Sequence, residues 1–195
     1  MSDFFRTVKG ISNGIYKEKM SKFIAFVEPA ATADEAKAIV KKYQNEYHDA
    51  RHVCWAYMIG TDRSEYLSSD NGEPSGTAGK PILGQLNSFE LTNVVAVVIR
   101  YFGGIKLGTS GLIVAYREAT RLAIEAGEIL ECHEQARHTF EFPYLSMNAV
   151  MGTIKKTGVK IIEQQFDNVC RMTIECDADA LPDFQARLST AINGF

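Results

Sequence analysis

The chain has 195 residues, of which 46% are hydrophobic and 23% are charged, a balance typical of an ordinary globular protein. A formal net charge of −3 gives no overall support for nucleic-acid binding, although it is compatible with a local basic patch. No stretch approaches the roughly 20 apolar residues of a membrane span, and the N-terminus MSDFFRTVKG lacks the apolar core of a signal peptide. The 4 cysteines show no CxxC spacing, so we expect no zinc site, no disulfide framework and a reducing cytoplasmic location.

The first part of the chain alternates extended runs with a helical pattern. FIAFVEP, residues 23–29, has the composition of a strand. Thr32 and Glu35 then have capping-box spacing, and the apolar residues that follow recur at helical intervals, which predicts a helix. HVCWAYMIG, residues 52–60, is predicted to be a buried strand, with residues 65–68 as a partner strand.

Two glycine-rich segments lie on either side of a second buried strand. The first, DNGEPSGTAGKP at 70–81, leads into a short helix that would carry Pro81 in its first turn. The apolar run 94–99 predicts a central strand over residues 94–100, and glycines follow at positions 103, 104, 108 and 111. The next helix, expected over about residues 109–127, has one apolar stripe, with Gly127 placed as its C′ residue.

Polarity rises over residues 128–137, where we place a domain boundary, giving domains at 1–135 and 137–195. The second domain is predicted to contain a strand at 138–144, a helix at 145–157 that ends at Gly158, and strands at 159–166 and 169–176 joined by Asp167-Asn168. A helix at 180–192 completes a βαββα order. This order lacks the last strand of the split βαβ pattern.

A buried strand, a glycine loop and a helix start can together point backbone N–H groups at an anion. The sequence motifs of nucleotide-binding loops nevertheless do not match these segments. The spacing from Gly103 to Gly108 fits the start of a P-loop, but the required lysine is absent. The other candidate, Lys80, has Pro74 where the first glycine should be, and the dinucleotide fingerprint GxGxxG is also absent.

The second loop keeps the features of a weaker anion site. Thr109 and Ser110 are candidate helix caps, and Lys106 and Arg100 could neutralise an anion. The equally good alternative is that the glycines only permit a tight connection between strand and helix. The two aromatic residues of the Arg-Tyr-Phe run at 100–102 could stack on bases or close the end of the core.

Two pairs of reactive side chains have both a functional and a structural interpretation. His52 and Cys54 would share one face of a strand, as a Cys–His nucleophilic pair or, more commonly, as a buried cysteine beside a hydrogen-bonded histidine. Asp70 and Glu73 could act as paired carboxylates or, flanked by glycine and proline, as turn residues.

Three blocks resemble the IMPACT/YigZ family: DARHVCWAY at 49–57, DNGEPSGTAGKPIL at 70–83 and VVIRYFGGIKLGTSGLIVAY at 97–116. RYFGGIKLG is similar to the family signature. The resemblance covers residues 1 to about 135 strongly and 137–195 by pattern. The positions that match its motifs are Glu73, Gly76, Thr77, Gly79, Arg100, Gly103, Gly104 and Gly108.

This resemblance implies an α+β protein. The N-terminal domain would be similar to the second domain of ribosomal protein S5, and the C-terminal domain would be ferredoxin-like, similar to an elongation-factor domain, with its last strand missing or short. Eukaryotic IMPACT members are translational regulators that bind the co-activator of the amino-acid-starvation kinase. The two-domain arrangement here is similar to that of bacterial members, for which the fold suggests ribosome or nucleic-acid association. The resemblance implies no catalytic residues.

Two main hypotheses follow. The first is a non-catalytic regulator or accessory factor of translation that binds RNA, the ribosome or a protein partner through the glycine loops, with Arg51, Lys80, Arg100 and Lys106 converging there. The second is an enzyme that acts on a small phosphorylated or carboxylate substrate between the two glycine segments, with Glu73 or His52 as the acid–base group. A protein–protein scaffold is a third possibility.

No cofactor or metal is expected under any of these hypotheses. The predicted binding residues are Arg51, His52, Glu73, Gly76, Thr77, Lys80, Arg100, Tyr101, Gly103, Gly104, Lys106, Gly108, Thr109 and Ser110.

Overall fold

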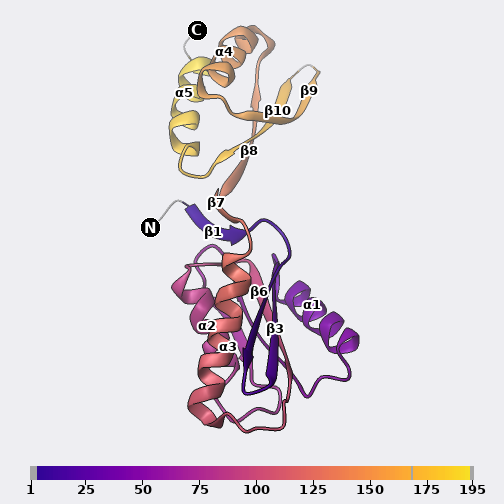
Figure 1. Cartoon of the computed structure of the whole chain (residues 1–195). Helices are drawn as coiled ribbons and strands as arrows, with labels where there is room; N and C mark the ends of the chain where they lie inside the picture. Colours follow the sequence, from indigo (N-terminus) through magenta and orange to yellow (C-terminus); the bar gives the residue numbers. More distant parts are fainter. Residues whose placement is uncertain (1–3, 168, 194–195) are drawn as a thin grey trace. The chain divides into compact units, whose positions relative to one another are not determined.

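The computed structural model describes residues 4–167 and 169–193 and confirms the predicted α+β class (Figure 1). Contacts divide the chain into two compact units, one from Phe4 to Cys132 and the other comprising the described residues from His133 onward. The division falls inside the polar segment 128–137. No helix in the described ranges is both long and apolar enough to span a membrane.

An antiparallel five-stranded sheet forms the centre of the first unit, with the strand order β2-β3-β6-β4-β5. Two helices, α2 and α3, cover one face of this sheet and α1 covers the other (Figure 1). A separate pair of strands, β1 and β7, lies outside it. The elements are β1 (Phe4–Val8), β2 (Ser12–Glu18), β3 (Ser21–Pro29), α1 (Ala33–Glu46), β4 (His52–Ile59), β5 (Glu65–Ser69), α2 (Gly79–Ser88), β6 (Val94–Tyr101), α3 (Gly108–Glu125) and β7 (Ile129–His133).

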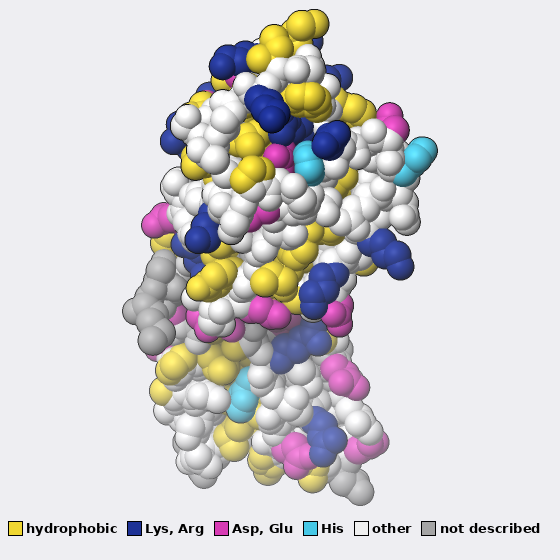
Figure 2. Space-filling model, turned by 90° about the horizontal axis from the view of Figure 1, so that it is seen from below, with side chains coloured by type: hydrophobic (Ala, Val, Ile, Leu, Met, Phe, Trp, Pro, Cys, Tyr) yellow, Lys and Arg dark blue, Asp and Glu magenta, His cyan; other side chains and the backbone are white. Residues whose placement is uncertain are grey.

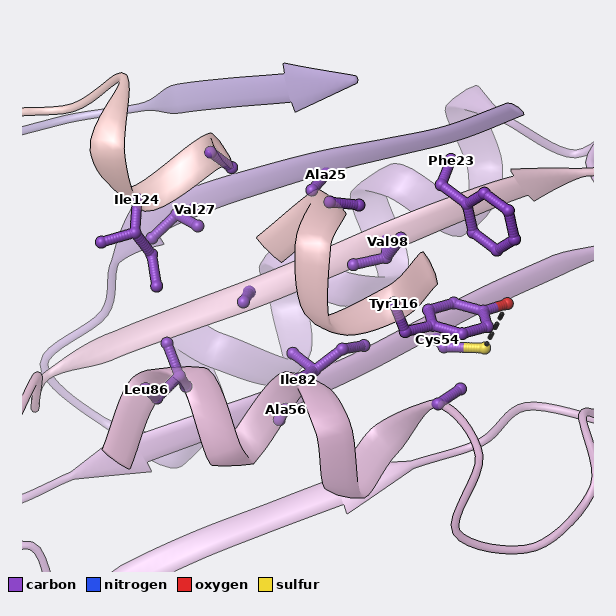
Figure 3. Close-up of a cluster of buried hydrophobic side chains, with 14 of the residues drawn as sticks. Phe23, Ala25, Val27, Cys54, Ala56, Ile82, Leu86, Val98, Tyr116 and Ile124 are labelled. Carbon is purple, nitrogen blue, oxygen red and sulfur yellow. Dashed lines mark hydrogen bonds between the residues drawn. The ribbon is translucent and has the colours of Figure 1, made fainter. Parts of the chain in front are cut away.

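Strand β6 explains the unbroken apolar run in the sequence. Even-numbered residues from 94 to 98 pack against α2 and α3, whereas odd-numbered residues from 95 to 99 pack against α1. Side chains alternate between the faces of a strand, so a strand covered on both faces needs apolar residues at every position. Figure 3 shows Val98 beside Tyr116 of α3. The predicted strand is confirmed, and it continues to Tyr101.

The start of α1 confirms the capping prediction with one difference. The Thr32 hydroxyl accepts a hydrogen bond from the Glu35 backbone N–H at 3.2 Å. The Glu35 carboxylate accepts from the N–H of Ala31 at 2.8 Å, one residue before the cap rather than at the cap itself. Such a cap stabilises a helix by about 1 kcal/mol.

The two ends of α3 differ from the predictions. The helix begins at Gly108, its N-cap residue is Leu107, and no side chain caps it, so the prediction that Thr109 or Ser110 would cap it is wrong. Both residues lie inside the first turn, too late to accept from its N–H groups.

At the other end of α3, Gly127 follows the C-cap residue Ala126 but does not adopt a left-handed φ. A Cβ on Gly127 would lie 2.8 Å from the Ser12 hydroxyl, so close packing requires this glycine.

The second unit forms a three-stranded antiparallel sheet with the order β8-β10-β9 and its own apolar core. Helix α4 ends at Gly158, as predicted, and the φ of +71° at this residue is the left-handed conformation that glycine allows at a helix end. No strand follows α5 in the described residues, and Asn168 of the predicted turn lies outside them. The elements are β8 (Gln135–Phe142), a short 3-10 helix η1 (Tyr144–Ser146), α4 (Met147–Thr157), β9 (Lys160–Phe166), β10 (Cys170–Asp177) and α5 (Leu181–Asn193).

Candidate functional site

The two glycine-rich segments meet at one end of the five-stranded sheet. In the sheet register, Arg100 at the end of β6 lies opposite both Phe23 of β3 and His52 of β4. The first segment is held against β4, because the Asn71 side-chain amide donates to the Val53 carbonyl at 2.9 Å. Seen from below, the molecule presents Lys and Arg side chains with hydrophobic ones between them (Figure 2).

A cavity of about 470 Å³ lies between these segments. Its lining comes from the start of β4, the first glycine segment, the end of β6, the second glycine loop and the first turns of α3. The lining residues are Arg51, His52, Glu73, Pro74, Arg100, Phe102, Lys106, Leu107, Gly108, Thr109 and Leu112.

A nearly buried carboxylate, that of Glu73, lies at this cavity with 3% of its side chain exposed. One of its oxygens accepts a hydrogen bond from Nη1 of Arg100 at 2.6 Å and another from the Tyr116 hydroxyl at 2.8 Å. Burial raises the pKa of Tyr116, so its phenol stays protonated and donates. Charge-assisted bonds of this kind hold a carboxylate in one orientation.

His52 lies beside this ion pair. Its Nδ1 is 2.9 Å from the Asn71 carbonyl oxygen, and we assign a proton to Nδ1 because a carbonyl can only accept. Its Nε2 lies 3.9 Å from a Glu73 carboxylate oxygen. In the neutral ring, Nε2 is therefore an acceptor at the cavity, close to a fixed carboxylate.

Cys54 does not form a nucleophilic pair with His52. Its Sγ lies 3.0 Å from the Asp70 carbonyl oxygen and 3.3 Å from the Tyr116 hydroxyl (Figure 3). Burial raises the pKa of the Cys54 thiol to about 12, so the thiolate that a nucleophile needs is not populated near neutral pH. The structure supports the interpretation of a buried cysteine beside a hydrogen-bonded histidine.

Asp70 acts as a turn residue. Its carboxylate accepts hydrogen bonds from the backbone N–H groups of Gly76 at 2.7 Å, Ala78 at 2.9 Å and Gly79 at 2.8 Å. Burial alone would raise the pKa of Asp70, but these three N–H groups and the charge of Lys80 outweigh it and lower the pKa. The carboxylate is therefore committed to the backbone of its own loop, and pairing it with Glu73 for acid–base chemistry is not supported.

The predicted binding residues divide into three groups. Those that line the cavity are Arg51, His52, Glu73, Arg100, Lys106, Gly108 and Thr109. Ser110 lines a smaller neighbouring cavity of about 230 Å³. The others, which line neither cavity, are Gly76, Thr77, Lys80, Tyr101, Gly103 and Gly104.

These remaining residues have structural surroundings of their own. The Thr77 hydroxyl donates to the Pro74 carbonyl at 2.6 Å, and the Tyr101 hydroxyl donates to Asp49 at 2.9 Å. A Cβ on Gly103 would overlap the backbone of Met20, so this glycine lets the loop pack against the β2–β3 turn. Gly104 has a φ of +88°, which favours glycine.

The sequence-based site omitted the apolar part of the cavity, formed by Pro74, Phe102, Leu107 and Leu112. Phe102 is 43% exposed, and the Arg100 guanidinium lies 5.4 Å from its ring centroid. One signal was available. Arg100 and Phe102 are two apart, a spacing that in an extended segment places both side chains on the same side of the chain, with Tyr101 on the other.

The chain matches the family model of the Impact N-terminal domain over residues 19–124. It belongs to the IMPACT family. The family member YigZ of Escherichia coli K12 is 33% identical over 178 residues, which cover 90% of this chain and 87% of YigZ. These matches confirm the resemblance found in the sequence.

Two solved structures are also similar to this IMPACT family chain. A hypothetical protein is 29% identical with a TM-score of 0.72, covering 97% of this chain and 93% of that protein. Yih1, described as a two-domain translational regulator, is 25% identical with a TM-score of 0.41, covering 61% of this chain and 48% of Yih1.

Proposed function

We propose that this protein is a non-catalytic accessory factor or regulator of translation that binds RNA at the cavity between its two glycine segments. One observation carries the proposal: Arg51, Arg100 and Lys106, from three separate parts of the chain, line a single cavity. RNA-binding surfaces are built from such convergent cations, which contact phosphates. Lys80, the fourth cation expected there, is the second residue of α2 and is not part of the lining.

The two cations at the rim are available for a ligand. Arg51 and Lys106 are both exposed. Neither forms a salt bridge or a side-chain hydrogen bond within residues 4–167 and 169–193. A local positive rim of this kind supports phosphate binding even though the whole chain carries a net charge of −3.

The apolar side of the cavity supports single-stranded RNA in particular. Phe102 is the exposed aromatic ring there, with Leu107 and Leu112 nearby in the same lining. Single-strand binders combine a cationic track with aromatic rings on which bases stack, and each stacked base contributes about 1–3 kcal/mol. Membership of the IMPACT family is the reason for placing such binding in translation.

Equilibrium binding of a short single-stranded RNA at several salt concentrations tests the proposal. The double variant Arg51→Ala/Lys106→Ala should bind more weakly, and the slope of log K against log salt should fall by about 1 for each phosphate that a side chain no longer neutralises. Lys41→Ala is the matched control, since Lys41 is an exposed lysine of α1 on the opposite face of the sheet. Absence of RNA binding at low salt, or equal binding by the double variant, would refute the proposal.

A second candidate function is an enzyme that acts on a small phosphorylated or carboxylate substrate. The observation that favours it is the 3.9 Å separation between His52 Nε2 and the Glu73 carboxylate at a concave cavity. A histidine beside a fixed carboxylate can transfer a proton. Turnover of a panel of phosphate esters and carboxylic acids, lost in His52→Ala, would support the enzyme. If the wild-type protein converts none of these compounds, the result would count against the enzyme hypothesis.

A further inference from the structure

We propose that the cavity binds the terminal phosphate monoester of an RNA chain, with the terminal nucleotide inside it and the rest of the strand leaving past the rim. This inference rests on the proposed RNA binding and adds which part of the RNA is recognised. It is argued from the unmet hydrogen-bond donor of Arg100, the uncapped start of α3 and the volume of the cavity.

Arg100, which lines the cavity, has a buried donor that the described part of the protein does not use. The Arg100 side chain is only 7% exposed, and its Nη1 is bonded to Glu73. Its Nε is buried and has no hydrogen-bond partner in the part of the chain that the structure describes. A guanidinium held almost out of water with an unmet donor is costly unless an acceptor reaches it. Arg100 lines the cavity, so an anion bound there is the acceptor that we assign to this guanidinium.

Helix α3 adds a second set of donors to the same floor. Leu107, Gly108 and Thr109 at its start all line the cavity. This helix of 18 residues has no side-chain cap and no acidic residue in its first turn. Its first N–H groups and the positive end of its dipole therefore favour an anion there. The arginine and the helix start belong to separate elements, yet both contribute to one cavity.

A terminal phosphate suits this floor better than an internal one. It carries a charge of about −1.5 to −2 and three acceptor oxygens, whereas an internal phosphodiester has one charge and a nucleotide on each side. A cavity of about 470 Å³ has room for a small ligand such as one nucleotide, but a strand passing through would keep its phosphates at the rim. Only a chain end can bring its phosphate to the floor.

The carboxylate of Glu73 does not prevent this. Its charge is balanced by Arg100 at 2.6 Å, and the Tyr116 hydroxyl occupies the same oxygen at 2.8 Å. The second oxygen faces His52 Nε2 at 3.9 Å. The net charge available to the ligand is therefore positive, supplied by Arg51 and Lys106 at the rim and by the helix start.

The experiment compares three eight-nucleotide RNAs of the same sequence, each with an internal fluorophore, carrying a 5′-phosphate, a 3′-phosphate or hydroxyls at both ends. One phosphorylated RNA should bind about tenfold more tightly than the hydroxyl-ended RNA, and which one does so identifies the end. A nucleoside monophosphate with its phosphate at the same position should compete.

Thr109→Glu is the most informative variant. An acidic residue in the first turn of a helix is favourable for the helix, so the protein should remain folded. At the cavity its charge would repel the ligand and abolish the preference for a phosphorylated end, whereas the neutral Thr109→Gln should retain most of it. Lys41→Ala should behave as wild type.

The outcomes separate the two proposals. All three RNAs could bind equally, with the Arg51→Ala/Lys106→Ala variant binding each of them more weakly by the same factor. The surface would then bind internal phosphates, so the RNA-binding proposal would hold and the end-recognition proposal would be wrong. A preference that survives Thr109→Glu would also overturn it. If none of the RNAs binds at low salt, both proposals fail.

Discussion

Asp70 and Glu73 are neighbouring carboxylates in one glycine-rich segment, and the fold uses them in opposite ways. Asp70 accepts three backbone N–H groups of its own loop. Glu73 instead accepts from the side chains of Arg100 and Tyr116, on β6 and α3, and lies at the cavity. The first carboxylate shapes a loop locally, whereas the second links distant elements at the candidate site. Residue type and sequence neighbourhood alone do not separate these roles.

The largest expected effect is that of Glu73→Ala. It leaves the nearly buried Arg100 guanidinium without its ion-pair partner, and breaking a buried pair in this way costs about 3–5 kcal/mol of stability. Urea unfolding followed by circular dichroism measures the loss. Arg100→Ala/Glu73→Ala is the control, and it should be less destabilised than the sum of its single variants because the pair is coupled. Additive losses would show that the pair contributes little.

Asp70→Ala should have the next largest effect. It leaves the N–H groups of Gly76, Ala78 and Gly79 without their acceptor, and we expect a loss of about 2–3 kcal/mol, measured in the same unfolding experiment. Asp70→Asn, which keeps one acceptor oxygen, should lose less. Equal stability of Asp70→Ala and the wild type would contradict the structural role of this residue.

Substitutions of the two carboxylates should have different effects on the affinity for RNA. Glu73→Gln removes a negative charge from the cavity and releases Arg100, so it should bind RNA about tenfold more tightly even though the protein is less stable. Asp70→Asn should not improve binding, because its carboxylate is occupied by the loop backbone. Binding by Glu73→Gln that is weaker than wild type would indicate that this carboxylate itself contacts the ligand.

Asp70 should contribute to the loss of stability of the protein at acid pH. Its pKa is lowered in the folded protein, so this carboxylate contributes stability that is fully present above its unfolded pKa of about 3.9 and is lost as the pH falls through the lower folded pKa. Free energies of unfolding measured between about pH 5 and pH 2 should therefore fall less steeply in Asp70→Asn than in the wild type. Parallel curves for the two proteins would argue against a lowered pKa.

The smallest effect is expected for Lys80→Ala. Lys80 is exposed and acts on Asp70 only as a nearby charge, so stability should change by less than about 0.5 kcal/mol. Because Lys80 does not line the cavity, RNA affinity should change much less than in Lys106→Ala, the matched lysine variant. A loss equal to that of Lys106→Ala would place the RNA over α2 as well.

Local sequence patterns were sufficient for most elements. The capping spacing of Thr32 and Glu35 predicted the start of α1, and Gly158 predicted the end of α4. These features depend on contacts between residues a few positions apart, which a linear pattern records. The start of α3 was not predictable in this way, since Thr109 and Ser110 have good capping chemistry but the helix begins one residue before them.

Patterns along the chain were enough to identify the family, the main strands and helices, and the two segments from which the candidate site is built. Which residues of those segments meet depends on the three-dimensional arrangement of the elements. The register of β4 against β6 places His52 opposite Arg100, and α3 brings Tyr116 to Glu73. It also leaves Tyr101 bonded to Asp49 and Lys80 outside the cavity. Such pairings depend on strand register and helix packing between residues far apart in the chain, and no local spacing encodes them.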